Sequence, residues 1–219
     1  MSNTQGYIPK VTQTIGNTKG VLSMDDIQHL NKQNLWLSAG QLELIETKTW
    51  AGNQHLDFQA IKQETYGIHF MTISGYRVSA GSQDFGIQFY ERGTLETSNV
   101  YKYARYTNRI SDGAVSNEVT TTGGAIRIDN TASEQWNISG YLYFYGLGNN
   151  QAFSSCTGLF TKQRMSSGGS DNDNGTYNGT LYGCMPQINL TVDGIRLENT
   201  RTTTADGGIV SLYGIREYT

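Results

Sequence analysis

From residue 34 onward the chain is a succession of short segments in which apolar and polar residues alternate, separated by clusters of Gly, Ser, Asn and Asp. Alternation with a period of two places one set of side chains on a buried sheet face and the other set on the opposite face. Leu142 and Phe144, for example, alternate with three tyrosines. The expected strands cover residues 35–40, 41–50, 66–73, 84–91, 100–106, 125–129, 137–147, 157–164, 180–185, 187–199 and 207–218. We therefore expect about ten strands, joined by turns, and no helix of ordinary length after residue 60.

This pattern predicts an all-β fold, an antiparallel β-sandwich of the jelly-roll or lectin-like type. Antiparallel strands with one dry face pack as two sheets, and no helices intervene that would build a parallel sheet. The composition agrees, because 14 tyrosines, 26 glycines and only 16% charged residues suit strands with polar uncharged outer faces. The sequence has no fixed period of about 20 to 50 residues, which argues against a propeller or solenoid. We assign residues 34–219 to one sandwich domain.

Residues 1–33 have a different character. Up to residue 24 they are rich in Thr, Asn, Gln and Gly without a sustained period, and Pro9 favours an extended backbone. Ser23 is suited to cap a short helix that follows, since Asp25 and Asp26 complement the positive end of a helix dipole. We expect an extended N-terminal arm and a short helix, with the arm either frayed or lying across a neighbouring subunit.

Charge and hydropathy exclude two classes of partner. A net charge of −3 and a pI near 5.6 supply no basic field for phosphates, so we expect no nucleic-acid partner. No apolar run approaches the roughly 20 residues that span a bilayer, so we expect no membrane partner. The opening MSNTQGYIPK lacks the regions of a signal peptide. We therefore expect the chain to be made in a cytoplasm.

The three histidines, His29, His55 and His69, do not have the close spacing of a metal site within one element. His69 alternates with its apolar neighbours, which predicts a position on the solvent side of a strand or at an interface. No GxSxG elbow accompanies these histidines. We expect no catalytic residue, no metal and no cofactor.

Paired carboxylates leave a glycoside hydrolase open as an alternative, because such enzymes hold two of them in one cleft. Six carboxylates are available but lie beside turns or on polar strand faces, where such groups are ordinarily solvated. They are Asp57, Glu64, Asp84, Glu91, Glu134 and Asp193. The segment DNDNG at residues 171–175 resembles part of a calcium loop, but Tyr182 stands where the full pattern requires glutamate.

The two cysteines, Cys156 and Cys184, are 28 residues apart and have no second pair near them. This spacing does not indicate a zinc site. Buried free thiols are the favoured interpretation, and a disulfide requires the two residues to meet in the fold.

Tyrosines offer the strongest functional signal. Two groups make wide amphipathic surfaces, namely Tyr101, Tyr103 and Tyr106 with Arg105, and Tyr141, Tyr143 and Tyr145. Such surfaces serve as protein interfaces, as platforms for sugar rings, or as plain packing between strands. No individual binding residue follows from the pattern. The polar segment 166–180 predicts a long exposed loop.

The C-terminal part of the chain contains TTGGAIRI, WNISGYLYFYG, GTLYG and TADGGIVSLYGIREY in this order. In these blocks it resembles a family of virion structural proteins of marine bacteriophages, especially those that infect cyanobacteria. The GGxxxLYGI motif at the end is the most recognisable piece, and the likeness covers residues 66–219. The matching positions are Gly207, Gly208, Leu212, Tyr213, Gly214 and Ile215.

The resemblance implies a jelly-roll or lectin-like sandwich that forms a homo-oligomer, often a homotrimer, as a capsid decoration or tail-associated component. From it we expect a non-enzymatic virion protein whose partners are its own copies and other capsid or tail proteins, with residues 1–33 attaching it to the particle. The alternative is a carbohydrate-binding module of a tail fibre that recognises a host surface glycan. The family carries no catalytic residues to transfer.

Overall fold

The computed structural model describes residues 42–79, 83–110, 112–132, 136–164, 177–185, 191–199 and 204–216. These ranges form thirteen β-strands and no helix. The strands are β1 (Leu42–Thr49), β2 (His55–Phe58), β3 (Ile68–Val78), β4 (Gln83–Glu91), β5 (Thr94–Leu95), β6 (Tyr101–Arg109), β7 (Val115–Gly123), β8 (Ile126–Ala132), β9 (Trp136–Tyr145), β10 (Ser154–Arg164), β11 (Tyr177–Met185), β12 (Val192–Asn199) and β13 (Ala205–Ile215).

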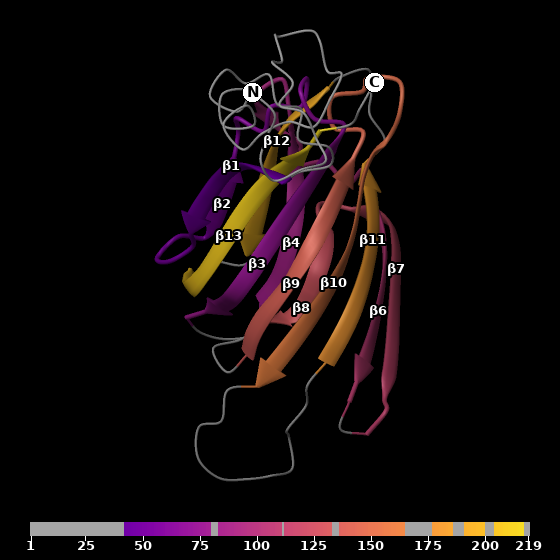
Figure 1. Ribbon diagram of the computed structural model, residues 1–219. Coiled ribbons are helices and arrows are strands. Elements are labelled where there is room, and N and C mark those ends of the chain that lie inside the picture. The colour runs from indigo at the N-terminus through magenta and orange to yellow at the C-terminus, as the bar shows by residue number, and fades with distance from the viewer. Residues whose placement is uncertain are drawn as a thin grey trace, which may run out of the picture. The chain divides into compact units, whose positions relative to one another are not determined.

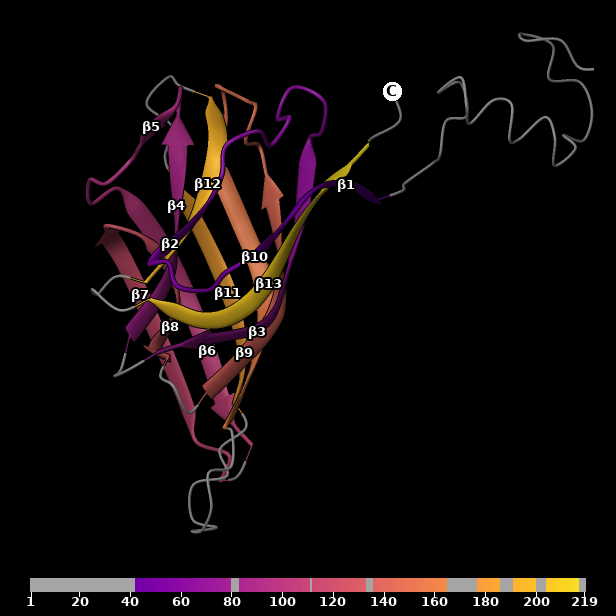
Figure 2. The same cartoon turned by 90° about the vertical axis from the view of Figure 1, so that its left-hand side faces the viewer.

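The strands form two antiparallel sheets. The larger sheet has eight strands in the order β1-β13-β3-β9-β10-β11-β6-β7, and Figure 1 shows it running from β1 and β13 on the left to β7 on the right. The smaller sheet has the order β2-β12-β4-β5, and β8 pairs with β4. Figure 2 shows β4 and β12 of the smaller sheet on one side and β3, β9 and β13 of the larger sheet on the other. The predicted antiparallel β-sandwich is therefore confirmed.

One hydrophobic core lies between the sheets. Aromatic rings bridge it, since Tyr76 of β3 stacks on Phe85 of β4 with ring centroids 4.2 Å apart, and Phe144 of β9 meets Phe89 edge to face at 6.1 Å. Leu142 is fully buried beside Phe144. The alternation of β9 thus predicts its inner face correctly, because a period of two assigns every second side chain to the core.

The closing strand β13 pairs with β1 on one side and β3 on the other, and Leu212 is fully buried in it. Gly214 is required here by close packing, because a Cβ at this position would lie 2.2 Å from the ring of Tyr66. Gly208 has φ +151°, a conformation that favours glycine. The glycines of the closing motif therefore have a structural reason.

The sequence does not predict three of the strands, namely β2, β5 and β7. Strand β7 is the longest of them, and its sequence VSNEVTTTG carries few apolar residues because it is an edge strand that pairs with β6 alone. The two strands form a hairpin whose turn includes Gly113 at φ 70°. The predicted loop 166–180 is also too long, because Tyr177 already begins β11.

The expected position of His69 on the solvent side of a strand or at an interface is wrong. The residue is fully buried, and its Nε2 donates a hydrogen bond to the Ile61 carbonyl at 2.7 Å. The phase of β3 explains the error, because His69 shares its face with buried Met71, whereas Ile68 and Phe70 lie on the opposite face. Burial lowers the pKa of His69, so the imidazole is neutral at pH 7.

Several expectations lie outside the described residues. These are the arm and short helix of residues 1–33, the boundary at residue 34, the strand at 35–40, the loop at 166–176 with its calcium-like segment, His29 and Glu134. Among the residues that are described, no helix is long and apolar enough to cross a membrane.

Candidate functional site

The face of the eight-stranded sheet that is turned away from the smaller sheet carries side chains aligned across every strand. Strand register places one residue from each strand in a single central row: Leu44, Tyr213, Phe70, Tyr143, Thr157, Tyr182, Ala104 and Val119. At the exposed end of this row, Tyr182 is 62% and Val119 is 73% exposed. Leu44 at the opposite end is 58% exposed, so large apolar side chains face solvent at both ends of the row.

Two further rows flank the central row. One consists of Thr47, Ser211, Thr72, Tyr141, Leu159, Thr180, Tyr106 and Asn117, and the other of Leu42, Ile215, Ile68, Tyr145, Ser155, Cys184 and Lys102. We call the three rows the outer face. Lys102 is the only charged residue in these rows.

Aromatic side chains cluster in the middle of the outer face. The ring of Phe70 lies 4.8 Å from Tyr143, 5.9 Å from Tyr141 and 6.1 Å from Tyr213. The expectation that Tyr141, Tyr143 and Tyr145 face outward is confirmed, since Tyr141 and Tyr145 are each 38% exposed and Tyr143 is half-buried. Offset and tilted ring contacts of this kind stabilise a rigid apolar surface.

A groove of about 580 Å³ lies on the outer face beside this cluster. Tyr145, Tyr182 and Val119 line it, and Lys102 lies at its margin with the backbone of neighbouring strands. Most of its lining side chains are apolar or hydroxyl-bearing. A surface of this chemistry favours contact with another apolar surface.

The outward side of the smaller sheet differs sharply, because it carries ion pairs. Arg196 of β12 binds Asp57 of β2 through two hydrogen bonds of 2.6 and 2.9 Å and also donates to the Tyr90 hydroxyl at 2.7 Å. Arg127 of β8 lies 3.3 Å from Asp84 of β4. The two outward surfaces of the sandwich therefore differ in charge as well as in size.

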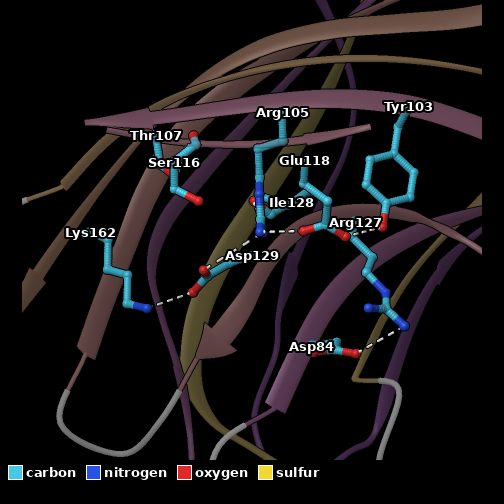
Figure 3. Close-up of polar contacts among 10 residues, drawn as sticks. All are labelled: Asp84, Tyr103, Arg105, Thr107, Ser116, Glu118, Arg127, Ile128, Asp129 and Lys162. Carbon is cyan, nitrogen blue, oxygen red and sulfur yellow. Dashed lines mark hydrogen bonds and ion pairs between the residues drawn. The ribbon is translucent and has the colours of Figure 1, made fainter. Parts of the chain in front are cut away.

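A second polar cluster lies inside the sandwich at the end formed by β6, β7, β8 and β10. Arg105 binds Glu118 at 2.6 Å and lies 3.9 Å from Asp129, which in turn accepts a hydrogen bond from Lys162 at 2.9 Å. Figure 3 shows these side chains converging from the two sheets. Arg105 is only 6% exposed, so this interior network holds its charges largely away from water.

One of the two predicted tyrosine surfaces, that of Tyr101, Tyr103 and Tyr106 with Arg105, is wrong. Tyr101 and Tyr103 are buried with Arg105 and do not form an exposed platform, whereas Tyr106 does face outward. The hydroxyl of Tyr101 accepts from the Phe89 amide and donates to a backbone carbonyl, both at 2.9 Å. Alternation explains the difference, because residues 101, 103 and 105 share the inner phase of β6.

Next to this network a polar cleft of about 430 Å³ opens between β7 of one sheet and β8, β4 and β12 of the other. We call it the edge cleft. Its lining includes two carboxylates, Glu118 and Glu198, with Arg127, and it also includes Gln88, Thr97, Asn99, Tyr103, Thr120, Thr122, Gly123, Gly124 and Ala125. Burial raises the pKa of Glu198, although the guanidinium groups of Arg196 and Arg127 act to lower it.

Neither carboxylate of the edge cleft was singled out from the sequence. Glu118 lies in the unpredicted strand β7, and Glu198 is one acidic residue among many at the end of a strand. The described carboxylates that sequence reasoning named lie elsewhere: Asp57 and Asp84 in the ion pairs above, Glu64 exposed, Glu91 buried beside the β4–β5 turn, and Asp193 accepting from the Gly93 amide. No signal in the sequence brings Glu118 and Glu198 together, because they are 80 residues apart.

The cysteines lie on neighbouring strands but on opposite faces. Register pairs Cys156 with Gly183 and Ser155 with Cys184, so the side chain of Cys156 enters the core and that of Cys184 enters the outer face. Both thiols are free. A disulfide cannot form without breaking the strand register. Burial raises the pKa of Cys156 to about 12, so this thiol is inert at neutral pH.

Metal-ligating side chains do not gather in the described part of the chain. No three His, Cys, Asp or Glu residues there come close enough to hold an ion. His55 lies on β2, and burial together with Arg196 lowers its pKa.

Comparisons with known proteins complete the description. No protein-family model and no curated protein matches the chain. Among solved structures, the CBM2 module of the evolved Dit of Lactobacillus casei BL23 phage J-1 is 9% identical and aligns over 75% of this chain and 70% of that one, with a TM-score of 0.20. A likeness at that score carries no argument about this chain.

Proposed function

We propose that this chain is a non-enzymatic structural subunit of a bacteriophage virion that assembles with copies of itself through the outer face. The observation that carries this proposal is the surface of aromatic, aliphatic and uncharged polar side chains that crosses all eight strands with one charged residue, Lys102, in its rows. Strands about 4.8 Å apart and rows about 6.8 Å apart give this face an area of roughly 800 Å². A stable interface buries about that much on each partner.

A second copy of the chain is the occupant that this chemistry fits. An interface between identical copies brings like residues near one another, so charged side chains would repel unless each met its opposite. The outer face avoids this difficulty because Lys102 is its only charge and lies in a flanking row. Surfaces that remain in water usually carry ion pairs, as the smaller sheet does around Arg196.

The resemblance to virion proteins supports the placement on a phage particle. The glycine pair and the LYGI sequence of that motif lie in β13, which joins β1 to the rest of the sheet and contributes Tyr213 to the central row. The motif thus belongs to the strand that completes the proposed assembly face. The resemblance favours a homotrimer on the capsid or the tail.

The non-enzymatic part of the proposal is supported by the state of Glu118. Its two oxygens accept hydrogen bonds from the Tyr103 hydroxyl and from Arg105, each at 2.6 Å. Both oxygens of Glu118 are therefore already engaged by partners within the protein. A hydrolase with two free carboxylates in the edge cleft is therefore disfavoured.

A carbohydrate-binding module that recognises a host glycan uses exposed tyrosines as stacking platforms. The tyrosines in the middle of the outer face suit this role less well, since Tyr141 and Tyr143 pack against each other and against Phe70. The apolar face also extends well beyond the footprint of a sugar ring. We therefore assign the outer face to assembly.

Light scattering on the purified full chain tests the assembly. We expect a closed oligomer, about 73 kDa for three copies of the 24.2 kDa chain. Tyr182→Glu places a charge in the central row and should shift the mass to that of a monomer, because an unpaired charge in a desolvated interface is strongly unfavourable. Thr94→Glu adds the same charge to exposed β5 of the smaller sheet and should leave the oligomer intact. A wild-type monomer at all concentrations would contradict the proposal.

A further inference from the structure

The edge cleft differs from the outer face in chemistry, although Tyr103 and Thr120 line both the cleft and the groove of that face. Its walls come from both sheets, with Glu118 on β7, Arg127 on β8 and Glu198 on β12. Its volume of about 430 Å³ is within the range of small-ligand sites and suits one or two sugar units. A ligand there would remain accessible in an assembly formed through the outer face.

Glu198 is the unusual group in this cleft. Among the residues that the structure describes, no donor makes a hydrogen bond to its carboxylate, and only charges at longer range act on it. Burial raises its pKa, so the charged form at neutral pH is less favourable in the folded protein than in the unfolded chain. A carboxylate that lowers stability and has no internal donor is a candidate for contact with a ligand.

The charges around Glu198 indicate that the ligand is neutral. Arg127 is paired with Asp84 at 3.3 Å, and Glu118 is paired with Arg105. The guanidinium groups of Arg196 and Arg127 already act on Glu198. An added cation is therefore not needed for balance, and hydroxyl groups can supply the missing donors.

The remaining lining is rich in hydrogen-bonding groups of both kinds. Among the lining residues, Asn99 offers an amide, and Thr97 and Thr122 offer hydroxyls. Gly123 and Gly124 leave backbone atoms accessible beside them, while Gln88 is fixed by its bond to the Gly124 carbonyl at 2.9 Å. Carboxylates, amides and hydroxyls arranged in this way match the alternating donors and acceptors of a polyol.

We propose that the edge cleft binds a neutral hexose unit of a glycan, with the Glu198 carboxylate accepting hydrogen bonds from two adjacent sugar hydroxyls and Asn99 completing the contact. This site adds glycan recognition to the proposed structural role and stands independently of it. The assembly face and the sugar site share no side chain that the proposal uses.

Calorimetric titration of the full chain tests the site. The probes are the methyl glycosides of glucose, galactose, mannose and N-acetylglucosamine, each raised well above the Kd on the order of 1 mM that is usual for a ligand of this size. We expect saturable binding of at least one of them. If none of the four binds, the proposal is wrong.

Glu198→Gln separates a ligand-binding role from a structural one. Loss of the charged acceptor should weaken binding by roughly 10-fold to 100-fold. The same substitution should raise the melting temperature at pH 7, since it removes a charge that burial disfavours. A lower melting temperature with unchanged affinity would overturn the proposal. Glu64→Gln makes the same change at an exposed position outside the cleft and should alter neither quantity.

The pH dependence gives a second readout. Binding should weaken as the pH falls through the raised pKa of Glu198, at a higher pH than an ordinary glutamate would produce. The oligomer mass of Glu198→Gln should equal that of the wild type. Failure of the sugar site and failure of the assembly are therefore distinguishable, because each has its own variant and its own measurement.

Discussion

Asp129 lies between two cations in the sandwich interior. Its carboxylate accepts a hydrogen bond from Lys162 at 2.9 Å and lies 3.9 Å from the guanidinium of Arg105 (Figure 3). Burial lowers the pKa of Lys162, whereas Asp129 acts to raise it. Among the described residues, Asp129 is therefore the closest carboxylate to Lys162, and it shares the compensation of Arg105 with Glu118, which lies 2.6 Å from that guanidinium.

Removing the charge of Asp129 tests this dependence. Asp129→Asn should lower the free energy of unfolding by about 3 kcal/mol, because the substitution removes a negative charge beside two largely buried cations, Lys162 and Arg105. Urea denaturation measures the change. Asp112→Asn makes the same substitution in the exposed pair with Arg109 at 3.2 Å and should change stability by less than about 0.5 kcal/mol. Equal effects of the two variants would show that burial does not matter here.

At the scale of single residues, the sequence predicts side-chain direction only where apolar residues mark the phase. Leu142 and Phe144 do so in β9, and their tyrosine neighbours face outward as expected. In β6 all the buried inner residues are tyrosine or arginine, so Tyr103 and Arg105 give no aliphatic signal. The sequence does not predict the position of Glu198 for another reason. Its cleft forms from strands that are distant in sequence.

Among the elements, β13 contributes both to the core of the sandwich and to the proposed assembly face. It pairs along its length with β1 and β3, and its inner residues Val210 and Leu212 are fully buried in the core. The eight-stranded sheet is continuous at β1 only when β13 pairs with both of its neighbours. A charge on the inner face of β13 should therefore disrupt the whole sandwich.

Leu212→Asp tests this role of β13. An unpaired carboxylate in the core loses its hydration without a partner, and the lost apolar burial adds to the effect, so we expect several kcal/mol of destabilisation and loss of the folded state. Ile209→Asp on the same strand is the control, because Ile209 is exposed and should tolerate the charge. Circular dichroism melting curves decide the matter. A cooperative transition retained by Leu212→Asp would refute the assignment of this residue to the core.

The three strands that the sequence does not predict, β2, β5 and β7, all lie at sheet edges. Strand β7 contributes few apolar side chains, and its partner β6 lies on one side only, so its sequence reads as polar turns. The sequence does not predict the central row either, because Leu44 and Tyr213 become neighbours only through the register of β1 with β13. Alternation within a strand assigns faces but does not assign partners.

For the molecule as a whole, the two sheets differ in which of their faces carries the charged side chains. The eight-stranded sheet turns charges such as Arg105 inward and leaves its outer face nearly uncharged, whereas the smaller sheet displays Arg196 and Asp57 outward. Burying ions inside a sandwich is unfavourable unless they are paired. The arrangement is understandable if the outer face is itself buried in the assembled state.

Cys184 reports on whether that face is covered. Its thiol lies in the groove of the outer face, whereas Cys156 is in the core with a pKa of about 12. A maleimide reagent at neutral pH should therefore modify one thiol per chain at most. In the wild-type protein we expect this reaction to be slow at high protein concentration and faster on dilution, because dissociation uncovers the groove.

The Tyr182→Glu variant supplies the comparison, since it should react at a rate that is independent of protein concentration. A local change around the groove could alter the rate itself but could not produce or remove a concentration dependence. Cys184→Ser should abolish the reaction and so confirm which thiol is modified. If wild-type Cys184 reacts as fast as Cys184 of Tyr182→Glu over the whole concentration range, the outer face is open to solvent and does not hold the copies together.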